Sequence, residues 1–213
     1  MILLALIALS LFMTFISSKV LTSTVLKGEK SSFVLELPPY RKPKFIRVIA
    51  DTVREKIIFV LGRAVVVAAP AGLIIWLFAN INSGGSSLLN HIANALDPIG
   101  HFIGIDGVML LAFILGFPAN EIVIPIALMA YLSTGEMTDY SSLESLKQIF
   151  VDNGWTTTTA LCTCVFSMFH FPCSTALITI WKETKSIKWT LLSVLTPLLC
   201  GVILCSLINL IFG

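Results

Sequence analysis

Long apolar runs separated by short polar segments dominate the pattern of this chain. A helix rises ~1.5 Å per residue, so about 20 apolar residues cross the ~30 Å hydrocarbon core of a membrane. Composition agrees, because 56% of the 213 residues are hydrophobic, only 12% are charged and the mean hydropathy is +0.94. The pattern predicts an all-α, polytopic transmembrane helical bundle with spans at about 1–26, 57–81, 106–134, 155–180 and 189–212.

Two of these runs are interrupted by helix-breaking residues. Gly116 and Pro118 interrupt the run 106–134, and Pro172 interrupts the run 155–180. As one straight helix, 106–134 would be roughly 40 Å long, which is too long for one crossing and too short for two. The sequence therefore predicts two half-helices, Gly107–Leu115 and Asn120–Leu132. They could form a re-entrant hairpin that enters and leaves on the same side, which requires that protein or a cavity surround the turn.

Loop charge bears on the topology. The segment 27–56 is rich in Lys and Arg, so the positive-inside rule places it in the cytoplasm, and from Lys44 it predicts an amphipathic helix on the membrane surface. The loop 135–153 is acidic apart from Lys147, whereas Lys182–Lys188 carries three lysines. A hairpin at 106–134 would put the acidic loop outside and the lysine loop inside. A full crossing would reverse both, and both topologies stay open at this point.

The segment 82–105 contains no Lys or Arg, which favours an external loop. We expect a short interfacial helix at Leu88–Leu96, stopped by Asp97 and Pro98. His91 and His101 lie in this segment outside any strong constellation, and we expect surface or capping roles for them rather than metal binding.

The candidate chemistry lies at the two breaks. A carboxylate at membrane depth is costly, so Glu121 suggests a function, and the alternative is a carboxylate bonded to backbone amides at the break. His170 and Cys173 are three residues apart, a spacing that shares one face of a helix, and with Glu121 they could bind a divalent metal such as Fe(II). The rival role for His170 is a polar tie between helices. The expected gate positions are Gly116, Pro118, Asn120, Glu121 and Pro172. We expect four other cysteines to act as packing residues: Cys162, Cys164, Cys200 and Cys205.

Several motifs resemble, in the same order, the C-terminal membrane half of the ferrous iron transport protein B (FeoB) family. They are Glu36–Arg41, Gly116–Pro125, Phe169–Thr175 and Lys182–Thr184. The region around Asn120 resembles the second of the family's two Gate, or nucleoside recognition, regions, so we expect 57–213 to be a Gate-type region. The resemblance implies Fe(II) uptake across a bacterial inner membrane, coupled to an N-terminal GTP-binding domain.

The chain also departs from that family. It contains no Gly-x-x-x-x-Gly-Lys-Ser/Thr loop for a nucleotide phosphate, and the first Gate region is absent. We therefore expect a fragment, a split-gene product or a degenerate copy, inactive without its other half. GTP would bind only to that half. No catalytic constellation or nucleic-acid partner is indicated.

The expected partners are Fe2+, lipid, the GTPase and first-Gate half, and further copies of the chain. The alternatives are a non-transporting assembly or regulatory subunit and, on weaker grounds, a nucleoside-type permease.

Overall fold

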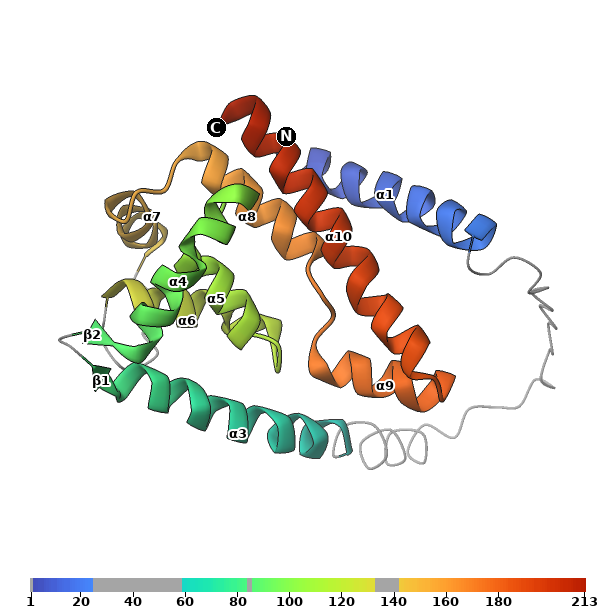
Figure 1. Ribbon diagram of the computed structural model, residues 1–213, viewed down its shortest axis with the longest axis horizontal. Coiled ribbons are helices and arrows are strands. Elements are labelled where there is room, and N and C mark those ends of the chain that lie inside the picture. Colours follow the sequence, from blue (N-terminus) through green and yellow to red (C-terminus); the bar gives the residue numbers. More distant parts are fainter. Residues whose placement is uncertain (1, 25–58, 84–85, 133–141) are drawn as a thin grey trace, which may run out of the picture. The chain divides into compact units, whose positions relative to one another are not determined.

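The computed structural model describes residues 2–24, 59–83, 86–132 and 142–213, and this part of the chain is almost entirely helical (Figure 1). The strands described are those of a short ribbon, β1 (Asn82–Ser83) and β2 (Ser86–Ser87), paired antiparallel. The all-α prediction is therefore confirmed. The predicted amphipathic helix from Lys44 lies outside the described residues.

The chain divides into two compact units, Met1–Arg63 and Ala64–Gly213. The first contains α1 (Ile2–Thr24), whose segment Leu3–Thr24 is long and apolar enough to cross a membrane. No residue whose burial is described in α1 is buried, so its apolar side chains face outward. A surface of this kind is stable in lipid, where exposed apolar side chains carry no penalty.

A first helical pair leads into the second unit. Helix α3 (Phe59–Asn80) includes Pro70, and α4 (Leu88–Ile103) starts where the Ser87 hydroxyl accepts a hydrogen bond from the Asn90 N–H. The prediction that this second helix stops at Asp97 and Pro98 is wrong. A proline removes one backbone donor and strains the turn before it, and here the helix continues past Pro98 and ends at Gly104, in the left-handed conformation with φ 90°.

The predicted broken run forms a helical hairpin. Helix α5 (Gly107–Leu115) is followed by a break at 116–119, a single 3-10 turn, η2 (Asn120–Ile122), and α6 (Val123–Leu132). Asp106 caps the start of α5, and its carboxylate accepts a hydrogen bond from the hydroxyl of Tyr131 near the end of α6. The end of α6 therefore lies beside the start of α5. We call the Asp106–Tyr131 end the hairpin base and Gly116–Ala119 the hairpin tip.

The remaining helices are α7 (Leu143–Asp152), α8 (Thr157–Phe169), α9 (Ser174–Thr184) and α10 (Ile187–Phe212). Together α8 and α9 satisfy the length and composition of one membrane span, and α10 satisfies them alone. Helices α8 and α10 run antiparallel and side by side, and the Thr158 hydroxyl donates to the Phe212 carbonyl at 3.0 Å (Figure 1).

Two cysteines join α8 to α10. The Cys162 thiol donates to the Cys205 carbonyl at 3.7 Å, and the Cys205 thiol donates to the Cys162 carbonyl at 3.3 Å. Both side chains are completely buried, which agrees with the packing role expected for them. Cys200 is half-buried, whereas Cys164 is exposed, so the packing prediction is wrong for Cys164. The two thiols are small enough to let the helix backbones approach closely.

Helices α4 and α5 meet at a bend of 104° and pack against each other through glycine. At Gly107 a Cβ atom would overlap the Ala93 carbonyl oxygen and lie 2.7 Å from the Asp97 nitrogen. At Gly104 it would lie 2.8 Å from the Cys162 sulfur, in a conformation that also requires φ > 0. Gly107 thus allows the hairpin base to sit directly against α4, and Gly104 allows the end of α4 to sit directly against α8 and α10.

We expect Gly107→Ala to destabilise the protein by about 1–3 kcal/mol or more, because the obstacle is backbone that cannot rotate away. The measurement is the apparent melting temperature of the purified protein in detergent, followed by circular dichroism. Gly72→Ala in α3 is the control, since nothing lies within 4 Å of its Cβ position. Equal melting temperatures for the two variants would contradict the close approach of α4 and α5.

Candidate functional site

The two helix breaks meet. The backbone N–H of Ser174, the first residue of α9, donates to the Phe117 carbonyl at 2.9 Å, and the Ser174 hydroxyl donates to the Pro118 carbonyl at 3.3 Å. Ser174 is buried, and the rings of Phe117 and Phe171 lie 5.7 Å apart. Both carbonyls freed at the hairpin tip are therefore satisfied by one residue of the other break, as backbone at membrane depth requires.

His170 lies beside this crossing with one ring nitrogen unused. Its Nδ1 lies 2.8 Å from the Ser167 carbonyl oxygen, which can only accept, so Nδ1 carries the hydrogen. Its Nε2 then presents a lone pair, and this atom is buried without a hydrogen-bond partner among the described residues. The ring lies among three phenylalanines, Phe113, Phe166 and Phe171, with centroids 5.2, 6.5 and 5.5 Å away.

This arrangement is the one that metal-binding histidines show, in which a backbone carbonyl fixes one nitrogen and the other faces the ion. The segment 170–173 is not helical, however, because His170 and Cys173 both have extended backbone with ψ near 173° and 158°. The shared helical face expected for these two side chains is therefore not formed. The Cys173 sulfur lies 3.1 Å from the Thr175 hydroxyl.

Glu121 and Asn120 lie in η2, directly after the hairpin tip, and both are exposed. The Glu121 carboxylate makes no hydrogen bond or ion pair with the described residues, so the alternative of a carboxylate tied to backbone amides is not seen. Within the described ranges, no three His, Cys, Asp or Glu side chains converge as a metal site. The structure thus brings Pro118 and Ser174 together but does not assemble Glu121, His170 and Cys173 into one ligand set.

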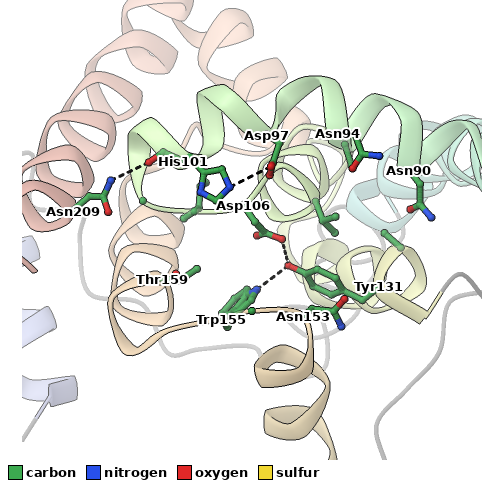
Figure 2. A pocket seen from close by; sticks show the side chains of 16 residues that line it. Asn90, Asn94, Asp97, His101, Asp106, Tyr131, Asn153, Trp155, Thr159 and Asn209 are labelled. Carbon is green, nitrogen blue, oxygen red and sulfur yellow. Dashed lines mark hydrogen bonds and ion pairs between the residues drawn. The ribbon is translucent and has the colours of Figure 1, made fainter. Parts of the chain in front are cut away.

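A polar cavity of about 580 Å³ lies at the other end of the hairpin (Figure 2). Its lining comes from α4, the hairpin base, the start of α8 and the end of α10, and includes Asp97, His101, Asp106, Asn153 and Asn209. His101 Nε2 lies 3.2 Å from Asp97 Oδ2, and the Asn209 carboxamide donates to the His101 carbonyl at 2.9 Å. His101 is exposed, as expected, but it belongs to a polar group that sequence reasoning did not find.

Three side chains hold the hairpin base against α8. The indole N–H of Trp155 donates to the Tyr131 oxygen at 2.8 Å, and the Tyr131 hydroxyl donates to Asp106 (Figure 2). The Trp155 ring stacks on Phe150 of α7, with centroids 4.2 Å apart. The polar tip of each aromatic side chain thus has a partner, as partly buried Tyr and Trp require. The signal available in the sequence was Asp106, a helix-capping carboxylate at the start of an apolar run.

We expect Ser174→Pro to disrupt the crossing selectively. Proline suits the first position of a helix, and the extended conformation of Cys173 suits the residue before it. The substitution nevertheless removes the backbone N–H that donates to the Phe117 carbonyl, and it places the proline ring against that carbonyl oxygen. The free energy of unfolding should fall by about 1–3 kcal/mol, the usual cost of an unpaired buried group.

The measurement is again thermal unfolding in detergent. Ile187→Pro is the matched control, because Ile187 is the exposed first residue of α10 and follows an extended residue. If Ser174→Pro and Ile187→Pro melt at the same temperature, the link between the two breaks does not stabilise the fold.

Two family models match this chain. Residues 61–187 match the family model Gate, described as nucleoside recognition, and residues 3–54 match the model of the ferrous iron transport protein B C terminus. No solved structure matches the chain.

Curated relatives include the Fe(2+) transporter FeoB of Staphylococcus aureus (strain MSSA476), 30% identical over 96% of this chain and 30% of the relative. The Fe(2+) transporter FeoB of Synechocystis sp. is 29% identical over 90% of this chain and 31% of the relative. The chain therefore spans less than a third of the length of these relatives. The Gate match covers more than half of the chain, so the chain belongs to the Gate family, and the two matches together correspond to the C-terminal membrane region of the ferrous iron transport protein B family.

Proposed function

We propose that the chain forms part of the membrane pathway of a ferrous iron transporter, with the ion passing the crossing of the two breaks. The observation that carries the proposal is the unpartnered Nε2 of His170 beside two interrupted helices. Interrupted helices that meet within the bundle are the usual construction of ion sites in transporters. The names of the curated relatives, Fe(2+) transporters, supply the substrate.

Depth supports the same assignment. Helix α8 has 13 residues, so its end lies roughly 20 Å from its start, within a hydrocarbon core ~30 Å thick. The hairpin tip contacts Phe171 and Ser174 just beyond that end, which supports a location of Asn120 and Glu121 at membrane depth. A carboxylate there is costly unless it faces a cavity or protein, and the exposure of Glu121 leaves it available to another part of a transporter.

The missing ligands are assigned to a partner. The described residues bring no third ligand to His170, so we propose that a GTPase and first-Gate half covers the exposed face of η2 and completes the path. On this proposal the chain alone is inactive, and GTP acts only on that half. The alternative is a purely structural subunit. A histidine that only tied helices together would accept a hydrogen bond at Nε2, and His170 accepts none from the described residues.

We propose a bacterial inner membrane as the location, with the hairpin base outside. The ends of α9 and α10 that meet at Thr184–Ile187 carry three lysines against one acid, Glu183, whereas α7, near the hairpin base, carries Glu144 and Asp152 against one Lys147. The positive-inside rule then places the lysine end in the cytoplasm. The hairpin enters and leaves on the outer side.

Cysteine labelling of intact cells tests the topology. In a background with Cys164, Cys173 and Cys200 replaced by serine, we expect an impermeant maleimide to label Glu144→Cys but to label Lys188→Cys only after permeabilisation. Cys162 and Cys205 remain, because their complete burial protects them from the reagent. Labelling of Lys188→Cys in intact cells would reverse the proposed orientation.

Uptake tests the ion path. We would replace the matched segment of the Staphylococcus aureus relative with this chain and measure the initial uptake of radioactive Fe(II) in cells that lack other ferrous transport. At equal membrane levels, Glu121→Gln and His170→Ala should each slow uptake by about tenfold or more, equivalent to ~1.4 kcal/mol in the barrier.

Glu144→Gln and His91→Ala are the matched controls, since both residues are exposed and lie away from the breaks. Unchanged uptake in both path variants would remove the proposed route. An assembly role would then be indicated if the same variants lost a co-purifying partner.

A further inference from the structure

The polar cavity at the hairpin base is suited to a cation. Two carboxylates line it, from Asp97 and Asp106, and no Lys or Arg is among its lining residues. Several carboxamides and the hydroxyl of Thr159 surround them, so oxygen atoms face the space from four different elements (Figure 2). The carboxamide of Asn94 makes no hydrogen bond with the described residues. Such a lining lowers the energy of a positive charge and offers many acceptors for water.

The carboxylates are arranged to bind through water rather than directly. Asp97 Oδ1 accepts from the Gly107 N–H at 2.9 Å and Oδ2 lies 3.2 Å from the imidazole of His101. Asp106 Oδ1 accepts from the Met109 N–H at 3.4 Å and Oδ2 accepts from Tyr131. Each oxygen is thus held in place by a donor but keeps a lone pair, which can accept from a water molecule on a metal ion.

The size of the cavity agrees with a hydrated ion. Six waters at ~30 Å³ each occupy roughly 180 Å³, well inside a cavity of about 580 Å³. Within the described residues, no three His, Cys, Asp or Glu side chains converge here to replace the water shell of an ion. The two carboxylates that line the cavity can instead accept hydrogen bonds from the water shell of a hexahydrated ion.

We propose that this cavity binds a hydrated divalent cation by outer-sphere contacts and concentrates it at the entrance to the membrane path. This inference rests on the proposed transport function, which supplies the direction of ion movement from the cavity toward the crossing. The cavity lies at the start of α8 and the crossing of the breaks at its end, roughly 20 Å further along. The ion is collected with its water at the first place and loses water only beyond the hairpin base.

The fluorescence of Trp155, which lines the cavity, provides the readout. The full chain, with Trp76, Trp181 and Trp189 replaced by phenylalanine, is placed in nanodiscs of phosphatidylcholine. The probes are Mn2+ and cobalt(III) hexammine, whose inert ammonia shell prevents any direct bond between metal and protein. We expect both to quench Trp155 saturably, with affinities that fall as ionic strength rises.

The test variant is Asp97→Asn with Asp106→Asn. Asparagine caps a helix as well as aspartate, so Asp106→Asn removes charge while keeping the start of α5. We expect the affinity for hexammine to fall by about tenfold per carboxylate at low ionic strength, as Coulomb's law gives for a water-like dielectric. Asp152→Asn, on α7 and outside the lining, should leave the affinity unchanged, with equal helical content in both variants.

Three outcomes would overturn the inference: quenching by Mn2+ without hexammine, equal affinities in the test and control variants, or saturable quenching by a neutral nucleoside such as uridine in place of the cations. Glu121→Gln and His170→Ala should bind both probes normally. Normal quenching together with unimpaired uptake in those two variants would reject the ion path through the breaks and leave the cation cavity standing.

Discussion

The requirement that freed backbone groups be satisfied away from water determines how this bundle is built. A helix broken at membrane depth exposes carbonyls that lipid cannot bond, and each unsatisfied group costs several kcal/mol. Here the tip of the α5–α6 hairpin presents the carbonyls of Phe117 and Pro118. Ser174, at the break between α8 and α9, donates a hydrogen bond to each of them. Neither break is stable in lipid without the other, so the α5–α6 hairpin must stand beside α8 with its tip at the start of α9.

A second consequence is that the hairpin has two chemically different ends. The tip is surrounded by phenylalanine rings and offers a single lone pair on His170. The base is held by Asp106, Tyr131 and Trp155 and borders a polar cavity. The base can approach α4 because Gly107 carries no side chain, and the end of α4 can approach α8 and α10 because Gly104 carries none. Close packing at these two glycines therefore makes the polar end possible, and it brings Asp97 and Asn209 to the edge of the cavity.

The breaks were predictable from sequence, whereas the cavity was not. Gly116, Pro118 and Pro172 act on their own backbone, so their effect can be inferred locally, and α5 ends at Leu115 as the pattern indicates. Pro98 shows the limit of that reasoning, because packing of α4 against α5 keeps the helix intact through it. The cavity joins residues from 90 to 209, and their proximity depends on a 104° bend and on two glycine contacts. Apart from the glycines themselves, no nearby sequence pattern predicts the bend or these contacts.

The two polar places also differ in how much water an ion could keep. The cavity is large enough for an ion with its hydration shell, and its carboxylate oxygens are already held by protein donors. At the crossing, aromatic rings occupy the space that hydration water would need, and the described residues supply too few ligands to replace it. On the proposed function, an ion moving from the cavity to the crossing would exchange water for ligands of another chain or domain. The exposed carboxylate of Glu121 lies directly after the hairpin tip, and on the proposed function it would share in such a site with the second half of the transporter.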